Sequence, residues 1–306
     1  MAEQLTSHPE GIRVCGIPFY GNSGGRDISG STYFVDNNSG LDSNDGSTWE
    51  RAFKTLAKAI TISNLDIARG SDRWARRNTI YYCADTETAD LVAFPNKCDV
   101  IGCGSYDAND KPGITGNHVP VNDGNYGTRF YNIWFKAPAD ASPIVTLAST
   151  TSGCQFIGCT FSATATTTIG IQSTASPFLK VKDCRFEGAF VTSYITFGTG
   201  EAGGTEISGN TMLDAAASGI VVGSGMTSSW GSTIHDNFIS AAVMTINDDS
   251  NTTGLFYVYR NDIVSAANAT TLFVAGIDIN LARSANNFFT AADVATIYPI
   301  LDTTAA

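Results

Sequence analysis

The apolar residues of the C-terminal two-thirds of the chain recur in one short pattern, apolar-x-x-(Cys or Asn)-x-apolar. The central residues of successive copies are separated by 24 to 27 residues, which indicates an internal repeat. The first copy carries Ile at its centre, and the last carries Ser at its first apolar place. The copies are Phe130–Ile133–Phe135, Phe156–Cys159–Phe161, Val181–Cys184–Phe186, Ile207–Asn210–Met212, Ile234–Asn237–Ile239, Val258–Asn261–Ile263 and Ser284–Asn287–Phe289.

A second apolar position follows each of the first six copies by about 10 to 14 residues and keeps a similar period. A repeat of about 25 residues holds two or three short strands with their turns. One repeat cannot bury its apolar face alone, whereas coils stacked about 4.8 Å apart can. The pattern therefore predicts an all-β fold, a right-handed parallel β-helix (solenoid), rather than a leucine-rich-repeat horseshoe or a β-sandwich. The second markers are Leu147, Ile171, Phe197, Val222, Ile246 and Phe273.

Stacking places equivalent residues of successive coils above one another. The last apolar position becomes an internal core stack of Phe135, Phe161, Phe186, Met212, Ile239, Ile263 and Phe289. The central position becomes a structural ladder of Cys159, Cys184, Asn210, Asn237, Asn261 and Asn287. We expect the Asn side chains to hydrogen-bond along the axis and the two Cys to act as small buried apolar residues, with a disulfide between them as the less favoured alternative.

The N-terminal third has a different pattern. Residues 1–30 are rich in Gly and Ser, and we interpret them as an extended arm. Residues 31–75 are expected to cap the solenoid, with Phe53, Leu56, Ala57 and Ile60 at helical spacing. Residues 76–290 form the coils, beginning with strands over Thr79–Cys83 and Cys98–Cys103, and residues 291–306 form a C-terminal cap or tail. The β-helix thus spans residues 31–306.

The segment 33–60 resembles the start of pectate-lyase-like β-helix proteins. The resemblance rests on Tyr33-Phe34-Val35-Asp36, on Gly40 through Gly46, and on Trp49 through Ala59, which match an aromatic strand, an Asp/Asn/Gly turn and a Phe-Lys-Thr-Leu helix. With the coils, it covers residues 31–300. It implies the parallel β-helix, and it leaves function open, because the superfamily includes polysaccharide lyases and hydrolases, adhesins, phage tailspikes and trimeric phage head-decoration proteins.

Charge and cysteine usage narrow the possible partners and cofactors. The 306-residue chain has a net charge of −11, which argues against nucleic acid and an anionic membrane as partners. Its seven Cys contain no Cys-x-x-Cys pair, so we expect reduced thiols and no zinc site. Residues 1–30 lack a basic stretch followed by an apolar run, so no signal peptide is expected.

Candidate chemistry is sparse. The exposed candidates for lyase or hydrolase chemistry are Asp248, Asp249 and Arg260, which lack a convergent acidic face; we interpret the two Asp as turn residues. Asp36 through Asp45 offers many oxygens, but Asx turns explain the loop without Ca²⁺. The basic cluster of Arg69, Arg73, Arg76 and Arg77 with Trp74 is interpreted as a solvated or docking loop. We therefore assign no catalytic residue, metal or cofactor.

The resulting hypothesis is a phage virion structural protein, made in the host cytoplasm. The resemblance and the missing catalytic face favour a homotrimeric head-decoration (cement) protein whose residues 1–30 bind the major capsid protein. The alternatives are a tail fibre or tailspike module that binds host glycan, and a pectate-lyase-like lyase or hydrolase. Aromatic residues that could line a glycan groove, or else lie in the core or at trimer contacts, are Trp134, Tyr194, Trp230, Tyr257 and Tyr259.

Overall fold

The computed structural model describes most of the chain between residues 30 and 265. The described residues are 12–14, 17–19, 30–69, 76–104, 111–121, 125–148, 151–164, 166–198, 200–201, 203–222, 226–248, 253–265, 284–285 and 288–291. The expected C-terminal cap, beyond residue 291, lies outside these ranges. Within the expected N-terminal arm, they include an antiparallel pair, β1 (Ile12–Val14) and β2 (Ile17–Phe19).

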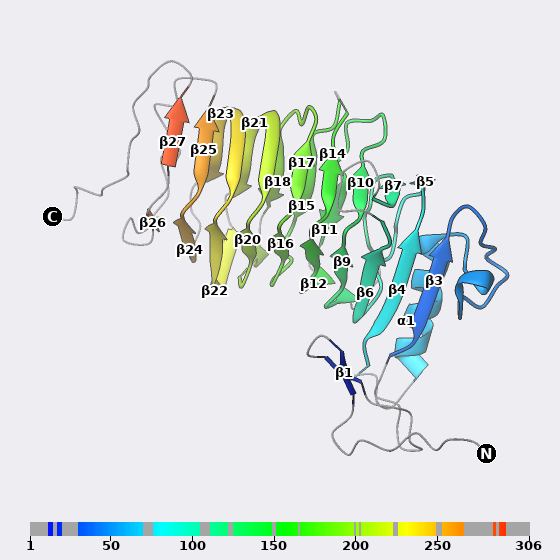
Figure 1. The fold of residues 1–306 in the computed structure, drawn as a ribbon. Helices are drawn as coiled ribbons and strands as arrows, with labels where there is room; N and C mark the ends of the chain where they lie inside the picture. Colours follow the sequence, from blue (N-terminus) through cyan, green and yellow to red (C-terminus); the bar gives the residue numbers. More distant parts are fainter. Residues whose placement is uncertain are drawn as a thin grey trace, which may run out of the picture.

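The chain forms a parallel β-solenoid, as the repeat predicts. Figure 1 shows successive strands side by side along one axis, in the order of the sequence. The pairing between strands of successive coils is parallel throughout the described coils, and right-handed winding stays a prediction. The first sheet consists of β3 (Thr32–Asp36), β4 (Asn78–Cys83), β6 (Cys98–Gly102), β9 (Arg129–Tyr131), β13 (Gln155–Ile157), β16 (Lys180–Lys182), β20 (Glu206–Ser208), β22 (Met226–His235), β24 (Thr253–Tyr259) and β26 (Ser284–Ala285), with β19 (Gly200–Glu201) beside β22.

The second sheet has two arms that merge. One arm consists of β5 (Glu87–Thr88), β7 (Gly113–Thr115), β10 (Trp134–Lys136), β14 (Thr160–Ser162) and β17 (Arg185–Glu187). The other, which we call the second arm, consists of β11 (Val145–Leu147), β15 (Ile169–Ser173) and β18 (Ser193–Phe197). Both arms pair with β21 (Thr211–Val222), and the sheet continues through β23 (Phe238–Asp248), β25 (Asp262–Ser265) and β27 (Phe288–Ala291). A two-stranded sheet joins β8 (Asn125–Tyr126) and β12 (Thr151–Ser152) at a corner.

The two apolar columns of the repeat face each other in the core. Phe161 pairs in register with Phe135 and Phe186, and the rings of Phe161 and Phe186 stack 4.8 Å apart. From the first sheet, Phe130 and Phe156 stack with each other and meet Phe135 edge-on. Side chains of the core stack from Phe135 to Ile263 are buried. Phe289 continues the register opposite Ile263.

The predicted second column mixes two columns that lie side by side. Ile171 pairs with Val145 and Ile195, whereas Leu147 pairs with Ser173, two residues further along β15. A shift of two residues keeps a side chain on the same face of a strand, so the apolar pattern alone did not fix this register. The last predicted marker, Phe273, lies outside the described residues.

The N-terminal cap contains a helix that starts later than the apolar spacing predicts. Helix α1 covers Leu56–Arg69 and buries Leu56, Ala59, Ile60, Ser63 and Ile67, whereas Ala57 is exposed. Phe53 belongs instead to a β-bridge with Val35 and donates its N–H to the Phe34 carbonyl. A short 3₁₀ helix, η1 (Trp49–Arg51), precedes this bridge. Leu56, Ala59 and Ile60 join the same core as the coils, and α1 lies against β3 and β4 (Figure 1).

Two carboxylates satisfy backbone donors at the start of α1. Asp42 accepts the N–H groups of Lys54 and Thr55 at 3.0 and 2.9 Å. Buried Glu87 is in register with Ile114, which itself pairs with Phe135 of the core stack, and it accepts the Leu56 N–H at 3.2 Å. Burial is the main cause that raises the pKa of Glu87. Carboxylates placed beside a helix N-terminus suit its partial positive charge.

The Asn ladder forms at one corner of each coil. The Asn210 side chain donates to Oδ1 of Asn237 at 2.9 Å, and Asn237 donates to Oδ1 of Asn261 at 2.9 Å. Each Oδ1 also accepts a backbone N–H of the preceding coil: Asn237 accepts from Asn210 at 3.0 Å and Asn261 from Asn237 at 3.1 Å. All three residues are buried, whereas Asn287 lies outside the described residues.

The two cysteines continue the ladder as free thiols. Asn210 Nδ2 donates to the Val181 carbonyl of the preceding coil at 2.9 Å. At the equivalent places, the Cys184 thiol lies 3.4 Å from the Phe156 carbonyl, and the Cys159 thiol lies 3.5 Å from the Phe130 carbonyl. A thiol is a weak hydrogen-bond donor. The two cysteines therefore occupy the place of the Asn side-chain amide but form a weaker hydrogen bond to the carbonyl.

Each ladder residue that the structure describes follows a residue in the left-handed region, and so does Ile133, the central residue of the first copy. Before Asn210 and Asn237 these are Gly209 (φ 66°) and Asp236 (φ 56°). The set is Asn132, Gly158, Asp183, Gly209, Asp236 and Arg260. Gly, Asn and Asp tolerate this conformation best, so Arg260 is the unexpected member. The left-handed residue turns the chain. The side chain of the next residue then hydrogen-bonds to backbone groups that the turn leaves without a backbone partner.

We predict that Asn237→Leu lowers the free energy of unfolding by about 1–3 kcal/mol, because buried polar groups lose their partners. The N–H and the Nδ2 of Asn210 lose an acceptor, and the Ile207 carbonyl loses a donor. Urea unfolding monitored by circular dichroism measures the change. Cys184→Asn is the matched control: it places an amide where a thiol already faces the Phe156 carbonyl, and it should be tolerated. Unchanged stability of Asn237→Leu would count against the ladder.

A second prediction concerns His118, which is buried and accepts the Leu91 N–H on Nδ1 at 3.2 Å. Burial lowers its pKa to about 4, and nearby Asp90 offsets this only in part. The unfolded chain takes up a proton near pH 6.5, so stability is full above that pH and falls as the pH drops toward 4, by roughly 3 kcal/mol. His118→Asn keeps an acceptor for Leu91 and should flatten this slope in urea unfolding between pH 7 and 4. An identical slope in the variant would refute the assignment.

Candidate functional site

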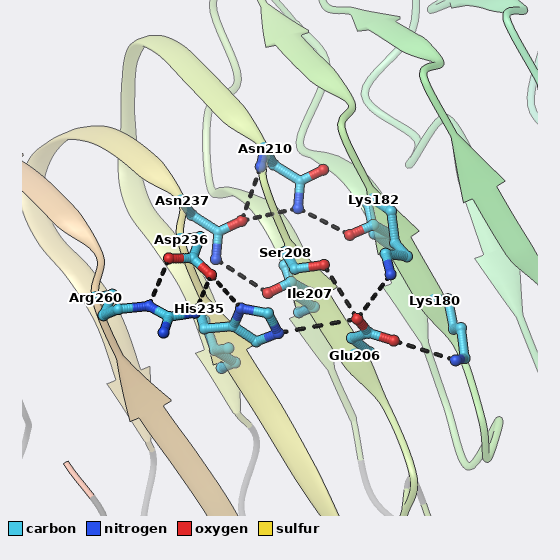
Figure 2. Close-up of polar contacts among 12 residues, drawn as sticks. Lys180, Lys182, Glu206, Ile207, Ser208, Asn210, His235, Asp236, Asn237 and Arg260 are labelled. Carbon is cyan, nitrogen blue, oxygen red and sulfur yellow. Dashed lines mark hydrogen bonds and ion pairs between the residues drawn. The ribbon is translucent and has the colours of Figure 1, made fainter. Parts of the chain in front are cut away.

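A group of charged side chains lies on the outward face of the first sheet, where two left-handed residues meet. Asp236 and Arg260 occupy equivalent corner positions in successive coils, and their left-handed backbone turns both side chains outward. Arg260 Nε donates to Asp236 Oδ1 at 2.7 Å and Nη2 donates to Oδ2 at 2.6 Å (Figure 2). This two-pronged geometry is the strongest form of an Arg–carboxylate contact.

His235 connects this pair to the preceding coil. Its Nδ1 lies 2.7 Å from Asp236 Oδ2, and its Nε2 lies 3.8 Å from Glu206 Oε1. The imidazole stacks on the ring of Tyr259, its in-register neighbour, at 4.8 Å between centroids and 2° between planes. Because one face is covered and both nitrogens face carboxylates, the ring is held in one orientation (Figure 2).

Glu206 is the centre of the other half of the group. Lys182 lies 2.9 Å from Oε1 and Lys180 lies 3.1 Å from Oε2, and Ser208 donates to Oε1 at 3.3 Å. Burial alone would raise the pKa of Glu206, but the hydrogen bonds from Lys182 and Lys180 outweigh it and lower the pKa. We call the group Lys180, Lys182, Glu206, His235, Asp236 and Arg260 the corner cluster.

The chemistry of the corner cluster favours a static, paired charge network over proton transfer. Hydrogen bonds from Arg260 first, and from His235 second, hold the pKa of Asp236 well below its usual range. The same bond with Asp236 raises the pKa of Arg260. A general acid or base needs a pKa near the working pH, and these shifts move both groups away from it.

Of the candidate residues for a lyase or hydrolase site, Arg260 is the one whose side chain the structure describes. Arg260 is committed to Asp236, a partner that the sequence did not indicate. Asp248 ends β23, its backbone in register with Val222, and Asp249 lies outside the described residues. The sequence did contain a signal for the corner cluster: charged or polar residues, such as His235 and Asp236, stand directly before a ladder residue and are expected to point outward. Strand alternation applied to each copy of the repeat would have placed Glu206 and His235 on the same face.

The five aromatic candidates lie in different environments. Tyr194 is wholly buried, and its hydroxyl donates to the carbonyls of Leu213 and Ser240, so it belongs to the core. Trp134 is half-buried, donates to Ser162 and lies under the Lys136 ammonium at 3.7 Å. Tyr257 and Tyr259 are half-buried, and Trp230 is exposed. They do not form one continuous groove along the coils.

The loop from Asp36 to Asp45 uses its carboxylates within the fold. Asp36 accepts the N–H groups of Asn38 and Ser39, Asp45 accepts that of Ser47, and Asp42 caps α1. These are the Asx turns that the sequence indicates. Within the described ranges, no three His, Cys, Asp or Glu side chains lie close enough together to hold a metal ion.

The predicted basic cluster is only partly described. Arg77 pairs with Asp99 at 2.6 Å and Arg76 with Asp66 at 3.5 Å, while Arg73 and Trp74 lie outside the described residues. Arg129 also pairs with Asp99, from the next coil. Of the helices that the structure describes, none has the length and apolar character needed to cross a membrane.

Comparison with known proteins adds no relative. No protein-family model, no curated protein and no solved structure matches this chain. The parallel β-solenoid therefore rests on the strand pairing itself.

From the paired state of Arg260 we predict no cleavage of polygalacturonate. A lyase base must accept a proton, and an arginine with a raised pKa next to Asp236 resists losing the one it carries. Ultraviolet absorbance of unsaturated products should stay at background for the protein. Product formation that disappears in Arg260→Ala would contradict this assignment.

Proposed function

We propose that this protein is a non-enzymatic structural protein of a phage virion, a homotrimer that decorates the outside of the capsid. The observation that carries the proposal is an outward face without charged side chains, on the second arm of the second sheet. It suits close packing against other copies of the same chain.

This uncharged face consists of two aligned rows. Thr146, Gln172, Thr196 and Val221 pair in register on successive strands and are half-buried. The residues that follow the strands, Ala148, Thr174 and Gly198, are uncharged and half-buried as well. Short uncharged side chains leave little to desolvate when two such faces meet.

The other outward faces differ in charge. The first sheet carries the corner cluster and the Arg77–Asp99–Arg129 contacts. The first arm of the second sheet carries Lys136, Arg185 and Glu187, with Arg185 Nε 2.7 Å from Glu187 Oε2. Charged surfaces keep copies apart or remain in solvent, so the second arm is the face that association would bury.

We expect the oligomer to have closed symmetry from general rules of assembly. The threefold order is taken from the resemblance to trimeric phage proteins. Soluble homo-oligomers are usually closed and symmetric. The phage proteins that the sequence resembles are trimers, in which solenoids stand side by side. In this proposal residues 1–30 bind the major capsid protein, and the solenoid stands outward. The paired state of Arg260 gives no support to the alternative of a lyase or hydrolase.

We predict that the protein has three times the mass of the 306-residue chain in solution. Light scattering coupled to size exclusion measures this. Gln172→Glu places a charge on the uncharged face and should dissociate the trimer, because the carboxylate would be desolvated in the contact. Gln155→Glu is the matched control: Gln155 is also half-buried, but it pairs in register with Arg129 and Lys180 on the first sheet.

The outcomes separate the face from a general effect of charge. Dissociation by Gln172→Glu alone supports the second arm as the contact. A monomeric mass at micromolar concentration would contradict the homotrimer. Equal dissociation of the trimer by both variants would place the subunit contact outside the uncharged face.

A further prediction concerns the arm. Deleting residues 1–30 should leave the trimer intact and abolish binding to undecorated capsids, because the uncharged face lies within residues 146–221. Co-sedimentation with undecorated capsids of the source phage measures binding. Retained binding by the truncated chain would show that the arm is not the anchor.

A further inference from the structure

Two cysteines occupy equivalent places on adjacent coils near the N-terminal cap. Strands β4 and β6 lie side by side and pair in parallel, with Tyr82 opposite Gly102 (Figure 1). The residues that follow these two, Cys83 and Cys103, are therefore the next neighbours in register. The Cys103 N–H donates to the Tyr82 carbonyl at 2.8 Å, which extends the backbone hydrogen bonds of the two strands to this place. We call Cys83 and Cys103 the thiol pair.

Both side chains of the thiol pair face outward as free thiols. Buried and half-buried residues alternate along β4, and Cys83 is half-buried beside buried Tyr82. Cys103 is half-buried beside buried Gly102 in the same way. Side chains of in-register neighbours on parallel strands project from the same face of the sheet. The two thiols therefore share the solvent-facing side of the first sheet.

Hydrogen bonds from the neighbouring coils hold the backbone of the thiol pair in register. The Cys83 carbonyl accepts the Asn37 N–H, from the coil before it, at 3.0 Å. The Asn132 side chain, from the coil after it, donates to the carbonyls of Gly102 and Gly104 at 3.2 Å each. These two glycines flank the second cysteine of the pair, so both cysteines are held from outside their own strands.

This register brings the two cysteines within reach of a disulfide. Neighbouring strands place Cα atoms about 4.8 Å apart, and disulfides form at Cα separations of about 4.4–6.8 Å when the side chains do not point apart. The Cβ atoms of in-register neighbours must approach each other by about 1 Å. Because β4 ends at Cys83 and β6 ends at Gly102, this approach leaves the pairing within both strands undisturbed.

The second in-register cysteine pair of the chain has a different environment. Cys159 and Cys184 are buried, and their thiols lie 3.5 and 3.4 Å from carbonyls of the preceding coil, in the place of the Asn amides. The core and the ladder account for these two residues. The thiol pair lies outside both, at a place that a dissolved oxidant can reach.

The surroundings of the thiol pair make its reaction slow at neutral pH. Burial is the main cause that raises the pKa of both thiols. Asp36 and Asp85 raise the pKa of Cys83 further, and Cys83 raises that of Cys103. The thiolate is the form that attacks a disulfide, so a raised pKa lowers the reactive fraction.

We propose that Cys83 and Cys103 are a modification site, at which a small disulfide such as oxidised glutathione converts the two thiols into a disulfide between adjacent coils. One thiolate attacks oxidised glutathione and releases one glutathione thiolate. The second thiolate attacks the resulting mixed disulfide and releases the other. The protein loses two electrons and two protons, and oxidised glutathione becomes two molecules of reduced glutathione. The site does not depend on the proposed virion function.

The test treats the full chain with oxidised glutathione at about pH 8.5, the ordinary pKa of a cysteine thiol. The chain carries Cys15→Ser, because Cys15 lies outside the described residues. Remaining thiols are then blocked with N-ethylmaleimide, and tryptic peptides are analysed by mass spectrometry without reduction. Trypsin places the two cysteines in separate peptides, 78–97 and 98–129, which should be joined by a disulfide within one chain.

Two controls assign the disulfide to the thiol pair. Cys103→Ser should abolish the linked peptides, which excludes buried Cys98 of the same peptide. Cys159 and Cys184 are the matched internal control, because they are also in-register neighbours but buried, and they should stay reduced. The melting temperature should rise by about 5 °C on oxidation, because the disulfide restricts the unfolded chain, and treatment should not change that of Cys103→Ser.

Several outcomes would overturn the proposal. Unreacted thiols, or glutathione retained on both cysteines without a link between them, would show that the register does not bring the sulfur atoms together. A link between two chains or a link that survives Cys103→Ser would assign the reaction to other thiols. Equal oxidation of Cys159 and Cys184 would show that the reagent acts on unfolded chain, and a lower melting temperature would show that the disulfide does not fit the fold.

Discussion

The need to satisfy the same backbone groups at every turn of the coil governs this structure. A left-handed residue redirects the chain, and the residue after it supplies the missing hydrogen bonds from its side chain. Asn supplies a donor and an acceptor at once, so Asn210, Asn237 and Asn261 link three coils through bonds of 2.9–3.1 Å. Corners in register keep the Phe columns in register, and the core depends on this alignment.

The buried columns could be predicted from the sequence because the interior accepts only residues of one kind at each place. Phe161 over Phe186 and Asn210 beside Asn237 follow from the repeat alone. The register within the second arm could not, because Val145 and Leu147 both point inward and either fits the period. The start of α1 was also obscured, since Phe53 has helical spacing but pairs with Val35 in the tertiary structure.

The contacts of outward-facing residues could not be predicted from the repeat, for a physical reason. Solvent imposes no size or polarity on them, so they do not repeat from coil to coil. Lys180, Glu206 and Thr233 occupy one outward register, yet they differ in charge and size. The role of His235 and Asp236 becomes clear only from their contact with Arg260. Arg260 lies 24 residues after Asp236 in the sequence but in the adjacent coil. One scaffold therefore presents a charged face and an uncharged face without changing its interior.

The same pair of residues, a left-handed residue followed by a ladder residue, recurs at one corner of successive coils. A segment of one coil's length can therefore be deleted or inserted without changing the kind of residue at that corner. Loss of residues 183–208 would join Lys182 to Gly209 and Asn210, so that one complete turn disappears while the kinds of corner residue stay the same. Such an event shortens the molecule by about 4.8 Å, the spacing of strands in a sheet. Height along the axis is thus the dimension in which this architecture can evolve by whole steps, whereas its cross-section is fixed by the packed interior.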